Sequence, residues 1–241
     1  MVNIIDCIRN VATDKYAFIK IAILAIPAII STHALMSGQM VLSITLNIVF
    51  GIIFAAVFFE TIRRSCNSEP MLLPTFLMPV RMFITLGFTI LAAIPIVIVN
   101  ILLFLLFVFV LAQNPQLMNN QIVFYIVYSI FYLLLVSLFF ASITQYLDTG
   151  KLYDAYKPMR IIKALSTFIV NLFAYAIQAI LFMLVAFVLP AWIILMLNGM
   201  NPMNFFFILY MCMFMVFNYL VFADYIGQTK KDSESPYNRL F

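Results

Sequence analysis

Charged residues are scarce in this sequence. Asp, Glu, Lys and Arg make up only 9% of its 241 residues, whereas soluble domains carry about 25%. Residues 82–147 and 164–223 contain none of them and no histidine, and within residues 21–59 His33 is the only ionisable side chain. A soluble helix or strand needs one face that water can wet, so the composition excludes a soluble fold. Each run is long enough for two helices of about 20 residues that cross a bilayer.

Residues that catalytic and metal sites need are also few. Histidine occurs once, at an expected turn, which excludes an HExxH or His-rich metal site. The three cysteines form no CxxC pair, and no Gly-rich phosphate loop occurs. The six glycines contain no GxxxG pair, so we expect bulky side chains to interdigitate between the helices. We therefore expect no enzyme activity, no cofactor and no bound metal ion.

The apolar runs that remain predict an all-α integral membrane protein. Six transmembrane helices pair as three α-hairpins, and each hairpin is expected to begin with an amphipathic lead-in helix on the cytoplasmic side. Pro27 and Pro95 fall inside two of the spans and predict local kinks. The six spans are expected at residues 17–31, 41–62, 83–106, 123–147, 166–192 and 205–225.

The distribution of the cations predicts the orientation. All thirteen Lys and Arg residues lie outside the three apolar runs, and hairpins would bring them to one side of the membrane. The opposite turns, near residues 37–38, 114–115 and 198–202, carry neither Lys nor Arg. The positive-inside rule then predicts that both termini lie in the cytoplasm, on the inner side of the cell membrane. Nucleic-acid binding is not expected, because the cations are spread over connectors that also carry the acids.

The first and last segments are expected to behave differently. Residues 1–15 predict an amphipathic surface helix, with Ile4, Ile5, Ile8 and Val11 on its apolar face; a frayed tail is the alternative. This start has no apolar core followed by a small-residue cleavage site, so it does not predict a signal peptide. Residues 159–165 predict another amphipathic lead-in. The polar tail, residues 229–241, is expected to be disordered.

Short similarities indicate an internal repeat within one membrane domain, residues 1–228. Phe58-Phe59, Phe139-Phe140 and Val221-Phe222 close the second helix of each hairpin. Pro79-Val80-Arg81-Met82 also resembles Pro158-Met159-Arg160-Ile161. The repeat units would be residues 1–65, 72–148 and 152–228, all oriented in parallel.

Polar side chains within the spans are the candidate functional positions. Glu60 precedes two arginines by three and four residues, and an interfacial salt bridge is the simpler interpretation. Asp224 has no such basic neighbour and is the better candidate for a functional carboxylate. Asn171, Tyr175 and Gln178 form a polar stripe on the fifth helix. Hydrogen bonding between helices explains the stripe most simply, and a polar permeation path is the alternative.

Several short segments resemble one family of membrane proteins. They are ETIRR at 60–64, Leu73-Pro74, GKLYDAY at 150–156, MRII at 159–162 and YIGQ at 225–228. The chain is similar in these to the uncharacterised six-span bacterial and archaeal family called domain of unknown function 4013. That family is related to membrane domains found beside glycerophosphodiester phosphodiesterases. The resemblance implies the six-span topology and a bacterial setting. It implies no catalytic residues, because none is established for the family.

Two functions from different classes fit these observations. The first is a non-enzymatic accessory or scaffold protein that acts on a membrane-protein partner or on membrane lipids at the cytoplasmic face, alone or as a homo-oligomer. The second is a small transporter or channel for a solute or lipid, which the repeats, the prolines and the polar stripe would serve. An intramembrane enzyme that uses Glu60 and Asp224 is a distant third.

Overall fold

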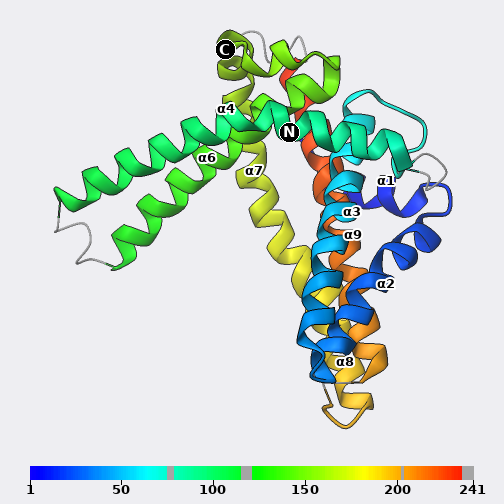
Figure 1. Cartoon of the computed structure of the whole chain (residues 1–241). Helices are drawn as coiled ribbons and strands as arrows, with labels where there is room; N and C mark the ends of the chain where they lie inside the picture. Colours follow the sequence, from blue (N-terminus) through cyan, green and yellow to red (C-terminus); the bar gives the residue numbers. More distant parts are fainter. Residues whose placement is uncertain (75–78, 115–120, 202–203, 235–241) are drawn as a thin grey trace. The chain divides into compact units, whose positions relative to one another are not determined.

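The computed structural model describes residues 1–74, 79–114, 121–201 and 204–234, and none of these residues forms a β-strand (Figure 1). Six of its helices are long and apolar enough to cross a membrane. The prediction of an all-α, multi-pass membrane protein is therefore confirmed. In chain order the elements are α1 (Ile4–Thr13), α2 (Ala17–Met36), α3 (Met40–Cys66), α4 (Pro79–Ala112), α6 (Gln121–Thr149), the 3₁₀ helix η1 (Leu152–Tyr156), α7 (Pro158–Met183), the π-helix η2 (Leu184–Val188), α8 (Leu189–Leu197) and α9 (Phe205–Glu234).

Three boundaries differ from those predicted. The helix α2 continues through Pro27 to Met36, so the first span is longer than residues 17–31. Residues 159–165 form the first turns of α7 rather than a separate lead-in helix. The helix α9 continues to Glu234, so the prediction of disorder is wrong for residues 229–234, and residues 235–241 lie outside the described part. A helix gains one backbone hydrogen bond per added residue, which explains continuation past the apolar segment.

The chain divides into two compact units. The core unit comprises Val2–Leu86 and Tyr175–Gln228, and the hairpin unit comprises Gly87–Ala174 with Met1 and the described residues that follow Gln228. These limits do not follow the expected repeat boundaries, and the internal repeat stays a prediction.

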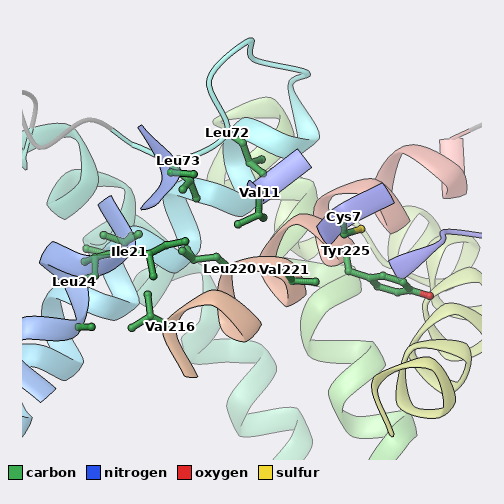
Figure 2. Packing of buried hydrophobic residues seen from close by; sticks show 14 of the residues in the cluster. Cys7, Val11, Ile21, Leu24, Leu72, Leu73, Val216, Leu220, Val221 and Tyr225 are labelled. Atoms are coloured by element: carbon green, nitrogen blue, oxygen red, sulfur yellow. The ribbon is translucent and has the colours of Figure 1, made fainter. Parts of the chain in front are cut away.

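The hydrophobic core of the core unit brings α1 together with the spans. Figure 2 shows side chains of α1, α2, α9 and the segment after α3 gathered there. The helix α1 buries Ile4, Cys7 and Val11, a spacing of three and four residues that keeps them on one face. Ile5 was expected on this face but is 66% exposed, whereas Cys7 is fully buried. The predicted amphipathic helix exists, and its apolar face lies against the protein.

Aromatic contacts set the register between α9 and the second part of the fifth helix. The rings of Tyr175 and Tyr225 are 4.8 Å apart, and those of Phe182 and Phe214 are 5.7 Å apart. As one residue number rises the other falls, so the two helices are antiparallel. Tyr175 thus lies level with the last apolar residues of α9. The apolar helix that carries the predicted fifth span, residues 166–192, extends from Pro158 to Leu197.

Two interior prolines are accommodated in the same way. Proline lacks an N–H, so each one leaves the carbonyl four residues earlier without its helical partner. Pro190 frees the carbonyl of Ala186, which accepts a hydrogen bond from the Tyr210 hydroxyl of α9. Pro95 frees the carbonyl of Leu91, which accepts one from Tyr156 of η1 at 3.1 Å. The π-helix η2 contains Ala186, which is consistent with a local loss of regular hydrogen bonding.

The hairpin unit pairs α4 with α6. Asn100 donates a hydrogen bond to the carbonyl of Leu135 at 3.2 Å. Further along, the rings of Phe107 and Phe131 stack with centroids 4.1 Å apart and planes inclined by 7°. A stacked pair of bulky aromatic side chains thus contributes to this contact.

Candidate functional site

The two candidate carboxylates of the spans lie in the polar end of the core unit. We use this name for residues 60–66 of α3, the segment 67–74, residues 224–228 of α9 and the helix α1. Glu60 and Asp224 are both buried there, at 0% and 2% exposure. A buried carboxylate is stable only when hydrogen bonds or cations compensate its charge. The partners of each one therefore define what it can do.

Asp224 is surrounded by hydrogen-bond donors from three helices. Ser65 Oγ of α3 lies 2.6 Å from Oδ1, and Asn10 Nδ2 of α1 lies 3.1 Å from Oδ2. Gln228 Nε2, one turn along α9, lies 2.6 Å from Oδ2. The carboxylate thus fastens α1 and α3 to α9, and its oxygens are engaged by neutral donors.

A close approach of α3 and α9 makes the contact with Ser65 possible. A Cβ atom built on Gly227 would lie 2.4 Å from the Ser65 Cβ and 3.1 Å from the backbone N of Cys66. Such distances are far below van der Waals contact, so only glycine fits between these backbones. Sequence reasoning did not identify this contact, because Ser65 belongs to no local motif and Gly227 was noted only as part of the YIGQ segment at 225–228.

The Cys7 thiol lies beside the same carboxylate. Burial raises the pKa of Cys7 because a thiolate would lose its hydration, and the negative charge of Asp224 raises it further. The thiol is therefore neutral at physiological pH. Since the thiolate is the reactive form, Cys7 is a packing residue rather than a nucleophile.

Glu60 accepts hydrogen bonds from its two predicted partners. Arg63 donates through Nη2 and Nε at 2.8 and 2.9 Å, and Arg64 donates through Nε at 3.1 Å. Thr85 Oγ1 of α4 adds a fourth bond at 2.9 Å. Glu69 lies 2.7 Å from Arg63 and joins the network. The interfacial salt bridge expected from the i, i+3 and i, i+4 spacing is therefore present.

A second buried cluster of opposite charges was not predicted from the sequence. Asp14 and Lys20 lie 3.0 Å apart across the turn between α1 and α2, and both side chains are buried. Asp14 accepts a bond from the Leu73 N–H at 2.9 Å, and Lys20 donates one to the Leu73 carbonyl at 3.0 Å. The pair therefore binds the backbone N–H and the carbonyl of Leu73, in the segment after α3. Asp14 and Lys20 are separated by a turn and not by helical spacing, and Leu73 is more than 50 residues away, so local spacing does not reveal this cluster.

The members of the polar stripe have separate partners. Gln178 Oε1 accepts the N–H of Ile4, at the start of α1, at 2.9 Å. The Tyr175 ring packs against Tyr225 of the core unit. Within the hairpin unit, Asn171 donates to Asp232 at 3.1 Å and is 1% exposed. These bonds are of the inter-helix kind, and the permeation path stays a prediction.

The chemistry available to these residues is hydrogen bonding and charge compensation. Among the residues that the structure describes, no group of three or more His, Cys, Asp or Glu side chains is placed to hold a metal ion. Comparisons with family models, curated proteins and solved structures find no match. The arrangement of the polar end is therefore the main guide to function.

Proposed function

We propose that this chain is a non-enzymatic accessory or scaffold protein of the bacterial inner membrane. Its polar end acts on a protein partner or on lipids at the cytoplasmic face, with both termini in the cytoplasm. The clustering of Lys and Arg outside the apolar runs supports this orientation. The segments at 60–64 and 150–156 support membership of the family called domain of unknown function 4013.

The surroundings of Asp224 carry the proposal. A carboxylate that binds a substrate or a transported cation needs free oxygen lone pairs and an approach route. Asp224 is 2% exposed, and three donors from its own chain occupy its oxygens. Glu60 is enclosed in the same way by Arg63, Arg64 and Thr85. Both carboxylates are thus suited to hold helices in position and to present a fixed surface.

Purification from native membranes tests the proposal. The full chain, solubilised gently, is expected to retain a stoichiometric protein partner, identified by mass spectrometry. The Asp224→Ala variant should lose this partner, because α1 would no longer be fastened to α3 and α9. The Asp6→Ala variant is the matched control, since Asp6 lies on the exposed side of α1, paired with Arg9. Retention of one solute class with no protein partner would contradict the scaffold.

One observation favours a small transporter or channel as the second candidate. The fifth helix is interrupted by the π-helix η2 immediately before Pro190, and interrupted spans often line transport sites. Cysteines introduced at Asn171 and Gln178 would report a water-filled path through their labelling by a membrane-impermeant maleimide. Labelling of both positions favours transport, and protection of both favours the scaffold.

A further inference from the structure

Two helices of the structure begin in the same way. Pro79-Val80-Arg81 starts α4 and Pro158-Met159-Arg160 starts α7. Val80 is 68% exposed and Met159 is 69% exposed, whereas the residues after the arginines, Met82 and Ile161, are buried. The Arg81 and Arg160 side chains are 52% and 49% exposed. The similarity noted in the sequence therefore extends to which side chains are exposed, and no role proposed so far uses it.

The arginine side chains at these starts have donors to spare. The nearest contacts between Arg81 and the carboxylates of Glu60 and Glu69 are 3.8 and 3.6 Å, which are ion-pair distances rather than good hydrogen bonds. Glu60 already accepts shorter bonds from Arg63 and Arg64. Arg63 and Arg64 thus already compensate the negative charge of Glu60, and the positive charge of Arg81 is not needed for that.

Arg160 is placed similarly at the other start. Its Nη1 lies 3.5 Å from Asp154, whose oxygen has a closer partner in Lys157. The ammonium of Lys157 in turn lies over the ring of Tyr153, 4.9 Å from its centroid. Hydrogen bonds and the charge of Lys157 keep the pKa of Asp154 below its usual value, so this acid is ionised at neutral pH. Lys157 compensates that charge, which leaves the guanidinium of Arg160 to face outward.

Exposed apolar side chains lie next to both arginines in the sequence. Val80, Phe83 and Ile84 are exposed around Arg81, and Met159 and Ile162 are exposed around Arg160. Half-exposed cations among exposed aliphatic side chains are typical of surfaces that lie at a membrane interface. A guanidinium also matches the two oxygens of a phosphodiester through paired hydrogen bonds. An acidic protein would satisfy the charge but would leave no reason for the aliphatic surroundings.

We propose that these two helix starts are docking sites for the headgroups of anionic phospholipids. Arg81 and Arg160 would each bind a lipid phosphate, while the neighbouring exposed aliphatic side chains contact its acyl chains. This inference rests on the proposed function, because it names the lipid class that the protein would meet at its cytoplasmic face.

The two sites should differ in their affinity for anionic lipid, because different residues follow the two arginines in the sequence. One turn after Arg160 stands Lys163, which is exposed, whereas the corresponding position after Arg81 is Ile84. The α7 start should therefore bind the anionic lipid more tightly than the α4 start.

Lipid titration of the purified full chain tests this order. Phosphatidylglycerol, with phosphatidylcholine as the zwitterionic reference, is added to the protein in detergent, and bound lipids are counted by native mass spectrometry. Arg81→Gln should weaken phosphatidylglycerol binding about fivefold, and Arg160→Gln with Lys163→Gln about thirtyfold, since each cation at an anionic surface contributes a similar free energy. Raising the salt concentration should reduce the difference between the two lipids.

The control variants distinguish lipid binding at a specific site from a general effect of the protein's positive charge. Arg9→Gln removes a cation from α1 that is even more exposed than Arg81 or Arg160, and binding should be unchanged. Arg160→Lys keeps the charge but loses the paired hydrogen bonds, so it should retain part of the affinity that Arg160→Gln loses, which a merely misfolded variant would not do. Equal losses for Arg9→Gln and Arg160→Gln, or no loss in the double variant, would overturn the proposal. A lost lipid preference with the protein partner retained would leave the scaffold function standing, and the reverse result would leave the lipid sites standing.

Discussion

The polar end of the core unit and the α4–α6 hairpin are each stabilised by a different kind of interaction. In the polar end, Asp224 and Asp14 each accept hydrogen bonds from two other segments, and Glu60 accepts one from Thr85 of α4. In the hairpin, by contrast, Asn100 donates one hydrogen bond to α6 and a stacked pair of phenylalanines adds contact.

The two kinds of interaction differ in how strictly they fix the geometry of the helices. Hydrogen bonds to a buried carboxylate require particular distances and angles, so they permit one arrangement of α1, α3 and α9. Apolar side chains interdigitate in many ways of similar energy, and lipid tails are as apolar as leucine. We infer that the polar end is the more rigid of the two regions. The predictions below test that difference.

The largest effect is expected at Asp224. Asp224→Ala removes the acceptor of Ser65, Asn10 and Gln228 and should lower the free energy of unfolding by about 3 kcal/mol, because buried donors are left unsatisfied. Denaturation in mixed micelles measures this loss. Peptide mass spectrometry after maleimide treatment should also find Cys7 labelled in the variant and protected in the wild type. Asn100→Ala in the hairpin should have a clearly smaller effect, and equal losses would refute the difference in rigidity.

Gly227 should show the next largest effect. In Gly227→Ala the added methyl meets Ser65 at 2.4 Å, so α3 and α9 must separate, and we expect a loss of about 2 kcal/mol. The matched control is Gly51→Ala, where a Cβ meets nothing within 4 Å. The control should be neutral or stabilised by up to about 1 kcal/mol, since alanine favours a helix. Similar unfolding curves for the two variants would contradict a close helix crossing.

A smaller effect is expected where a tyrosine hydroxyl donates to the carbonyl that a helix-interior proline leaves without its helical hydrogen bond. Tyr210→Phe deletes the donor to the Ala186 carbonyl and should cost about 1 kcal/mol of unfolding free energy. Adding Pro190→Ala should recover the loss, because the alanine N–H can bond to the same carbonyl. A double-mutant cycle on these two positions measures the coupling, and a coupling of zero would show that Tyr210 does not compensate for Pro190.

Some of the candidate site could be predicted because the relevant partners are close in sequence. Glu60 with Arg63 and Arg64 follows helix periodicity, and one turn of helix brings them together. The partners of Asp224 are Asn10 and Ser65, which lie in helices far from it along the chain. Asp224 was therefore singled out for lacking a basic neighbour, and its neutral partners were not found. Contacts between distant segments depend on how the helices pack, and no local pattern encodes them.

The amino-acid sequence alone determined that this is a helical membrane protein with six spans, because burying uninterrupted apolar runs in lipid requires helices whose backbone bonds are all internal. It also predicted where along the chain the helix α1, the salt bridge at Glu60 and the cationic segments occur. Only the tertiary structure decided that α1 buries Cys7 instead of Ile5, that α9 runs on to Glu234 and that Gly227 lies against Ser65. The first and the last of these features arise from the distances between helices, which are set by side chains on both partners at once.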